Sequence, residues 1–210
     1  SVSEIKNLGV IFDSSLSFKK HYHYISNKSL RMWGFIQRHC MDMNLSALKT
    51  LYCSMVRSIL EYCSPIWYPI YKNDISLLER VQKKFLRIIE FKEHHIHHHG
   101  QYEWAMNLLN IKSLLARRNM ADLCTLHAIL NGRIDSSNLL SQLKFRVPTS
   151  NSRSTRTCTI FRTAIVSTNN AVNHPLRRMM ESANNLAGEE KFQIFDTKLG
   201  AFKKLINNIM

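Results

Sequence analysis

Between Phe18 and Ile89 the chain repeats apolar residues at steps of three and four, and two prolines interrupt this stretch. The three resulting stripes are Phe18, Tyr22, Ile25, Met32, Trp33 and Ile36, then Leu48, Leu51, Tyr52, Met55, Val56, Ile59 and Leu60, then Ile75, Leu78, Val81, Phe85 and Ile89. Such spacing places each stripe on one side of a helix. Pro65 and Pro69 end the second helix, because proline cannot continue one. We therefore expect three amphipathic helices that bury their stripes against one another.

Polar residues fit the ends of these helices. Asn44 is placed to cap the second helix, and Asn73 or Asp74 the third. On the third helix, Glu79 and Lys83 are spaced for an ion pair of about 0.3 kcal/mol. The residues from 92 to 101 show no period and are expected to be irregular.

The rest of the chain carries mixed signals. Residues 4–12 are typical of a strand or hairpin arm. Helices are expected at 113–131, closed by Gly132, and at 175–186 and 195–209, whereas a β-like run covers 155–166. The fold class is therefore mainly α, with a short N-terminal β element, a minor β stretch near 155–166 and a helical C-terminal region.

The charge balance indicates a polyanionic partner. Lys and Arg number 29 against 15 Asp and Glu, which gives a net charge of +14. No acidic residue occurs from Ser136 to Met180. Nucleic acid and an anionic membrane surface both fit this excess, and so does a merely basic soluble protein. No apolar run is long enough for a membrane span, so we expect no membrane association of that kind.

The five cysteines are odd in number and form no Cys-x-x-Cys spacing. A disulfide framework or a zinc ribbon is therefore not expected, and an intracellular, reducing compartment fits better. The chain opens with Ser inside a strand pattern, so we expect a fragment or a processed boundary.

No catalytic residue is expected. Two-metal phosphoryl transfer needs carboxylates that hold two metal ions about 4 Å apart, and no two aspartates lie within four residues of each other. Gly-x-Ser-x-Gly and Gly-x-Gly-x-x-Gly are both absent. The adjacent acids Glu189 and Glu190 follow a glycine in a polar stretch and fit a solvated loop.

A histidine cluster is the weak candidate for metal binding. Its members are His94, His95, His97, His98 and His99. Imidazoles at this density can bind Zn²⁺ or Cu²⁺. The spacing is not that of a known site, and a polar linker with adventitious metal affinity is the alternative that we favour.

Two basic helix faces are the stronger candidates for binding. The first carries Lys19, Lys20, Lys28, Arg31 and Arg38, and the second carries Arg80, Lys83, Lys84 and Arg87. Basic side chains on such faces can contact phosphates while the apolar stripes pack together. A solvated helix face is the alternative for each helix, and the net charge favours nucleic acid.

Several blocks resemble one protein family. They are Ile5-Lys6-Asn7-Leu8-Gly9-Val10, Tyr52 to Tyr68, Leu78-Glu79-Arg80-Val81-Gln82-Lys83-Lys84-Phe85, Ser113-Leu114-Leu115-Ala116-Arg117-Arg118, Phe145-Arg146-Val147-Pro148 and Asn184-Asn185. In order and spacing they resemble the region after the palm of reverse transcriptases from non-LTR retrotransposons, the jockey-like elements and their relatives. The Glu-x-Val-Gln-x-x-Phe spacing is the most specific of these matches.

The resemblance implies a nucleic-acid-binding role. Residues 1–15 would be the palm edge with the primer grip at Leu8 and Gly9, residues 16–92 a helical thumb, residues 93–112 a His-rich linker and residues 113–210 a C-terminal extension. Arg117 and Arg118 would join the contacts to an RNA/DNA template–primer.

The same resemblance implies that the chain lacks the catalytic parts of the polymerase. The catalytic Asp pair and the fingers would lie upstream in the same polyprotein, so the chain alone would not be an enzyme. It would need no cofactor, whereas the full-length polymerase would use Mg²⁺, and the family implies nuclear and cytoplasmic locations. A degenerate retroelement remnant, a metal-dependent protein using His94–His99 and a membrane-surface protein remain the alternatives.

Overall fold

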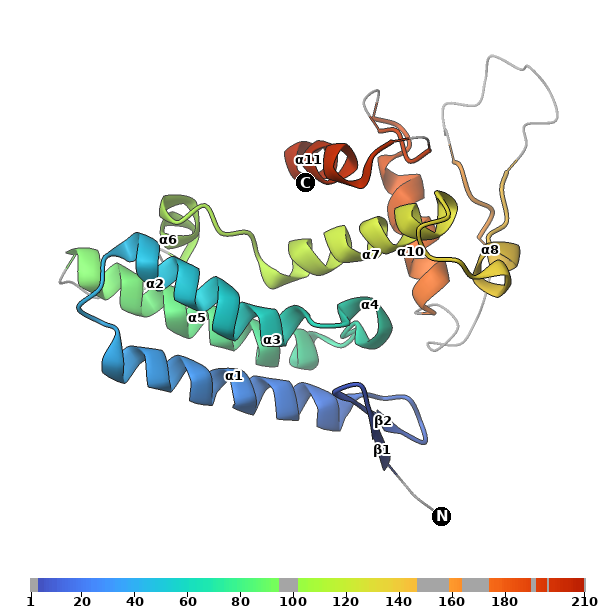
Figure 1. Cartoon of the computed structure of the whole chain (residues 1–210). Helices are drawn as coiled ribbons and strands as arrows, with labels where there is room; N and C mark the ends of the chain where they lie inside the picture. The colour runs from blue at the N-terminus through green and yellow to red at the C-terminus, as the bar shows by residue number, and fades with distance from the viewer. Residues whose placement is uncertain are drawn as a thin grey trace. The chain divides into compact units, whose positions relative to one another are not determined.

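The computed structural model describes residues 4–94, 102–146, 159–163, 174–189, 192–195 and 197–209 (Figure 1). The chain divides into two compact units, Ser1–Arg117 and Arg118–Met210, which are described separately below. Helices dominate, and a two-stranded sheet lies near the N-terminus. The expected fold class, mainly α with a short N-terminal β element, is confirmed.

The first unit opens with a β-hairpin. Strands β1 (Glu4–Asn7) and β2 (Val10–Asp13) pair antiparallel, with Asn7 opposite Val10. The two turn residues, Leu8 and Gly9, have φ of 45° and 87°. Both positive angles suit the tight turn that matches the twist of a hairpin, and glycine adopts such an angle without strain.

Asp13 organises the loop between the hairpin and the first long helix. Its carboxylate accepts hydrogen bonds from the backbone N–H groups of Ser15 (2.9 Å), Ser17 (3.0 Å) and Phe18 (3.0 Å). Partial burial acts to raise the pKa of Asp13, but the hydrogen bonds from Ser15 and Ser17 hold it well below its usual range. The charged carboxylate thereby fixes where α1 (Lys19–His39) begins.

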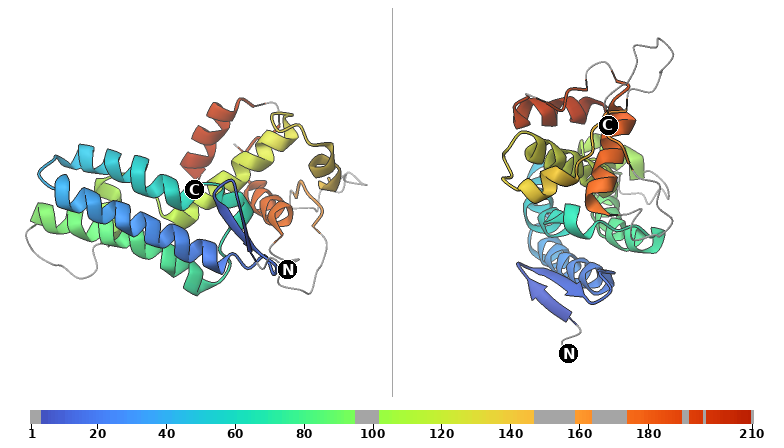
Figure 2. Two further views of the ribbon diagram at one scale, coloured as in Figure 1. Left: turned by 60° about the horizontal axis from the view of Figure 1, so that its bottom comes forward. Right: turned by 90° about the vertical axis from the view of Figure 1, so that its right-hand side faces the viewer.

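Three helical rods form the body of the first unit. They are α1, the continuous rod of α2 (Leu45–Leu51), the π-helix η1 (Tyr52–Arg57) and α3 (Ser58–Glu61), and α5 (Lys72–His94). The rods lie side by side in the views of Figures 1 and 2. Asn44 caps α2 as expected, because its side chain accepts a hydrogen bond of 2.8 Å from the N–H of Ala47.

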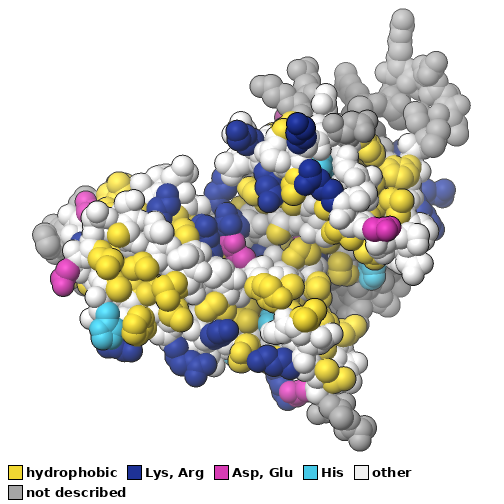
Figure 3. Space-filling model, in the orientation of Figure 1, with side chains coloured by type: hydrophobic (Ala, Val, Ile, Leu, Met, Phe, Trp, Pro, Cys, Tyr) yellow, Lys and Arg dark blue, Asp and Glu magenta, His cyan; other side chains and the backbone are white. Residues whose placement is uncertain are grey.

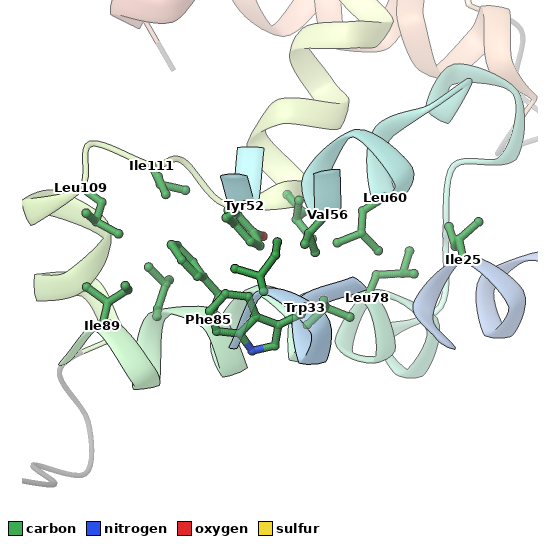
Figure 4. Close-up of a cluster of buried hydrophobic side chains, with 14 of the residues drawn as sticks. Ile25, Trp33, Tyr52, Val56, Leu60, Leu78, Phe85, Ile89, Leu109 and Ile111 are labelled. Carbon is green, nitrogen blue, oxygen red and sulfur yellow. The ribbon is translucent and has the colours of Figure 1, made fainter. Parts of the chain in front are cut away.

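The predicted apolar stripes meet in the core of this unit (Figure 4). Tyr52 and Phe85 stack with ring centroids 4.0 Å apart, and Trp33 meets Phe85 edge-to-face at 5.2 Å. Tyr52 and Phe85 have no exposed surface, and Trp33 has 2%. Aromatic pairs in these arrangements add to the free energy of burying their area.

The prolines act differently from the expectation. The second rod already ends at Glu61, because Tyr62 takes a non-helical ψ of 124°, and Cys63 follows with a left-handed φ of 55°. Pro65 then lies in the first turn of the short helix α4 (Ser64–Trp67), where a missing N–H costs nothing. Helix α5 begins at Lys72, ahead of the caps expected at Asn73 or Asp74.

The irregular segment expected at 92–101 is corrected in part, because helix α5 continues to His94. Helix α6 (Tyr102–Leu108) lies within residues 93–112, which were expected to be a His-rich linker. Ala105, Leu109 and Ile111 are buried in the first core. Residues 102–111 therefore pack as part of the first unit. A short helix such as α6 can do so because it buries one apolar side.

The second unit is built from α8 (Ser137–Gln142), α10 (Pro175–Leu186), α11 (Leu199–Ile209) and the part of α7 (Leu114–Leu130) from Arg118 onward. Its core includes Leu126, Met179, Phe202 and Ile206. Gly132 follows α7 with a φ of 65°, as expected for a residue that ends a helix. The bounds expected for α10 are confirmed, whereas α11 begins at Leu199 and not at 195.

The β stretch expected at 155–166 lies partly outside the described residues. Of the described part, Phe161 forms an isolated antiparallel bridge with Phe145. The side chain of Asn184 in α10 holds this pairing, because its Oδ1 accepts from the N–H of Ile160 (2.9 Å) and Phe161 (2.8 Å). Its Nδ2 donates to the Phe161 carbonyl at 2.9 Å.

Candidate nucleic-acid interface

One outer face of α1 combines cations with aromatic rings. The residues are Tyr24, Lys28, Arg31, Phe35 and Arg38, called the α1 strip below; steps of four and three keep them on one side of the helix. All are exposed except Tyr24, which is half-buried. Figure 3 shows Lys and Arg side chains along this helix with apolar side chains between them.

Three hollows border the α1 strip. They have volumes of about 760, 460 and 450 Å³. Tyr24 borders the 760 and 460 Å³ hollows, Lys28 borders the 460 and 450 Å³ hollows, and Arg31 borders the 760 and 450 Å³ hollows. The second rod contributes Ser58 of α3 to the 460 Å³ hollow and Met55 of η1 to the 450 Å³ hollow. Neighbouring hollows therefore share residues of the strip.

The hairpin turn closes one end of this surface. Lys6, Leu8 and Gly9 share the 460 Å³ hollow with Tyr24 of α1 and Tyr62 beyond α3. Leu8 is 82% exposed, and a Cβ built on Gly9 would lie 3.7 Å from Cε1 of Tyr62. Leu8 and Gly9, both expected from the sequence to bind nucleic acid, therefore line the same hollow as Lys28.

The cations around the α1 strip lower the pKa of Tyr24, and Lys6 has the largest effect. The Lys6 Nζ donates a hydrogen bond of 3.2 Å to the Tyr24 hydroxyl and lies 4.7 Å from the centroid of that ring. This hydrogen bond and the charge of Lys6, with smaller effects of Lys28 and Arg31, lower the pKa of Tyr24. Lys6 and Tyr62 were not expected in the site, because the hairpin and the end of the second rod meet α1 only in the fold.

His21 lies beneath the same hollow and joins the hairpin to the bundle. It is 1% exposed, its Nδ1 accepts a hydrogen bond of 3.4 Å from the N–H of Ile11, and its ring meets Trp67 edge-to-face at 5.1 Å. Burial, with a smaller effect of Lys6, lowers the pKa of His21 to about 4. His21 is therefore neutral at pH 7 and supports the hollow without adding charge.

The first unit should lose stability in mild acid because of His21. The unfolded chain takes up this proton near pH 6.5, whereas the folded chain resists it down to about pH 4. The free energy of unfolding should therefore fall between these values, by on the order of 3 kcal/mol. Urea unfolding at a series of pH values measures the slope, which His21→Phe should flatten. An equal change in the exposed control His23→Phe would contradict this assignment.

Helix α5 presents a second basic face. Arg80, Lys83, Lys84 and Arg87 are all exposed, as expected, and the Lys83 Nζ lies 5.4 Å from the centroid of the Tyr102 ring. Helical spacing places the four side chains on the side of α5 opposite its buried stripe.

The specific motif of α5 serves the fold. Glu79, which was expected to pair with Lys83, accepts a hydrogen bond of 3.0 Å from the N–H of Leu115 in the first turn of α7. Gln82 accepts from the Tyr52 hydroxyl at 3.1 Å and donates to the Lys112 carbonyl at 3.2 Å. These contacts join α5 to η1 and to the residues before α7.

Tyr102 of α6 lies beside this motif. Burial, with a smaller effect of Glu79, raises the pKa of Tyr102 to about 12.

Two arginines that were expected to join the contacts to nucleic acid are less exposed than the cations of α1 and α5. Arg117 is half-buried and donates two hydrogen bonds to the carboxylate of Glu61. Its Nη2 lies 2.8 Å from Oε2, and its Nε donates to Oε1. The hydrogen bond to Glu61 raises the pKa of Arg117. Arg118 has no exposed surface. Lys19 and Lys20 are exposed, and Lys20 forms an ion pair with Glu4.

The metal candidates fall largely outside the described residues. His95, His97, His98 and His99 are not described, and His94 is placed only as the last residue of α5. Within the described ranges, no group of three or more His, Cys, Asp or Glu is placed to hold a metal ion. In the same ranges, no helix has the length and apolar character needed to cross a membrane.

The chain is similar to a protein of Caenorhabditis elegans named "Uncharacterized protein B0403.1". The two are 28% identical over 130 residues, which cover 62% of this chain and 65% of that protein. The chain thus spans just under two thirds of the relative's length. No protein-family model matches the chain, and no solved structure matches it.

Proposed function

We propose that this chain binds the phosphate backbone of an RNA/DNA template–primer, as the thumb and C-terminal region of a non-LTR retrotransposon reverse transcriptase. The observation that carries this proposal is the α1 strip, which is bordered by hollows lined at one end by Arg38 and at the other by Leu8 and Gly9. Lys28, Arg31 and Arg38 lie on one helix face, where they can contact phosphates. The polymerase's palm, fingers and Mg²⁺ chemistry would be supplied upstream, and the expected locations are the nucleus and cytoplasm.

The packing explains why a binding role suits this fold. The motif residues Glu79, Gln82 and Phe85 are engaged inside the first unit, so they support the helices and leave the exposed cations for a ligand. Phosphate contacts position a duplex without reading its sequence. The proposed binding is therefore weakly sequence-dependent and strongly salt-dependent.

Charge reversal on the α1 strip tests the proposal. The double variant Lys28→Glu, Arg31→Glu should bind a fluorescent RNA–DNA hybrid about tenfold or more weakly. The slope of log affinity against log salt should become shallower by about 2, because two phosphate contacts are lost. Fluorescence anisotropy over a salt series measures both. The triple reversal at Lys83, Lys84 and Arg87 asks whether α5 contributes to the same slope.

A matched control separates a site from net charge. Lys203→Glu, Lys204→Glu makes the same charge change on exposed residues of α11. An unchanged salt slope in the α1 variant, or an equal change in this control, would rule out the strip as the interface. Binding to anionic vesicles that persists when RNA competes would instead favour the membrane-surface alternative, and failure to bind any hybrid would favour a remnant.

A further inference from the structure

The second unit carries its own combination of rings and cations. Residues 144–146 and 160–162 form a short ribbon, in which the N–H of Arg146 donates to the Ile160 carbonyl (2.9 Å) and the N–H of Arg162 donates to the Lys144 carbonyl (2.8 Å). The Asn184 side chain fixes the second strand to α10. The ribbon is therefore a defined surface whose side-chain directions follow from its pairing.

Two half-exposed phenylalanines meet at this ribbon. Phe145 and Phe195 are each 46% exposed, and their ring centroids lie 6.1 Å apart. Phe145 also packs on Phe161, and their ring centroids lie 5.4 Å apart. Phe161 is 2% exposed and belongs to the second core. Phe161 therefore supports Phe145 from the core, and the exposed parts of the Phe145 and Phe195 rings, which are tilted by 46° to each other, are each open to a flat ligand.

Three cations accompany the rings. In the ribbon's register Lys144 lies directly opposite Arg162, and Arg146 follows two residues along on the same face. All three are exposed, and the hydroxyl of Thr159 holds the Arg146 guanidinium at 2.7 Å. Like charges directly opposite one another destabilise a ribbon. Among the described residues no carboxylate forms an ion pair with them, so an anion would relieve the repulsion.

We propose that this ribbon binds single-stranded nucleic acid. Bases stack on Phe145 and Phe195, and the phosphates between them contact the cations. Stacking on exposed rings needs unpaired bases, because the base faces of a duplex are covered by their neighbours. The ribbon is only about 5 Å wide between strand axes, so one nucleic-acid strand crossing its edge reaches rings on one face and cations on the other. The site uses no residue of the α1 strip and stands independently of it.

Anisotropy with the full chain tests this site. The probes are a short fluorescent oligouridylate and a blunt, fully paired RNA duplex. Phe145→Leu keeps an apolar side chain but removes the ring, and it should weaken oligouridylate binding about 5- to 100-fold while leaving duplex binding unchanged. Phe145→Trp should retain binding. Phe195→Leu, which lies outside the ribbon, should reproduce the loss without disturbing the pairing.

A matched control decides between a site and a general loss of surface area. Phe91→Leu makes the same substitution at a residue of equal exposure on α5 and should have no effect. No affinity for oligouridylate, unchanged binding in both Phe→Leu ribbon variants, or an equal loss in the Phe91 control would overturn the proposal. Oligouridylate binding that survives Lys28→Glu, Arg31→Glu while hybrid binding is lost would separate this site from the α1 strip.

Discussion

Replacing Phe85 with alanine should lower the free energy of unfolding of the first unit by about 3–5 kcal/mol. The ring has no exposed surface, stacks on Tyr52 at 4.0 Å and receives the edge of Trp33 at 5.2 Å. Truncation removes both aromatic contacts and leaves a cavity between α1, η1 and α5. Rods that pack tightly cannot collapse fully into such a space, so the cavity adds to the lost transfer free energy.

Urea unfolding followed by tryptophan fluorescence measures this effect on one unit. The chain's three tryptophans, at positions 33, 67 and 104, all belong to the first unit. Phe91→Ala is the matched control on the same helix, because Phe91 is 46% exposed, and it should cost less than about 1 kcal/mol. Equal losses in the two variants would mean that Phe85 is not the centre of this core.

Phe85 also illustrates what local patterns can predict. It was selected because it lies at helical spacing from Leu78, Val81 and Ile89, and all four are buried. Periodicity and capping residues such as Asn44 are written into neighbouring residues, so one sequence suffices to find them. For the same reason the exposed cations of α1 and α5 were identified correctly as surface residues.

Contacts between distant residues were not predictable in this way. Arg117 was counted as a surface cation, but Glu61, 56 residues earlier, takes up its charge. Spacing offered Lys83 as the partner of Glu79 but did not indicate the N–H of Leu115, which donates to Glu79 in the fold. Net charge treats every arginine alike, whereas burial divides them into structural and exposed groups.

The candidate site was predictable only in part. Lys28 and Arg31 follow from helical spacing, but the hollows that join them depend on η1 and on the hairpin. No local rule indicated the π-helix, which requires one more residue per hydrogen-bonded turn within a pattern that still looks helical. Lys6 reaches Tyr24 only because the hairpin folds back on α1.

Removing the carboxylate of Asp122 should lower the free energy of unfolding of the second unit by about 3–5 kcal/mol. Asp122 is 1% exposed, and Arg178 contacts it through Nε at 2.6 Å and Nη2 at 3.2 Å. Asp122→Ala would leave the guanidinium of Arg178, whose side chain is 14% exposed, without this counter-charge. Hydrogen exchange of peptides from α7 and α10 reports on this unit, which holds no tryptophan.

The double variant Asp122→Leu, Arg178→Met should behave differently. Burial raises the pKa of Asp122 although Arg178 acts to lower it, so desolvation outweighs the attraction within the pair. A raised folded-state pKa means that ionisation opposes folding as the pH rises through the ordinary carboxyl range. Replacing both charges with apolar side chains should therefore restore protection to the native level or above. Protection as low as in Asp122→Ala would show instead that the pair itself stabilises the unit.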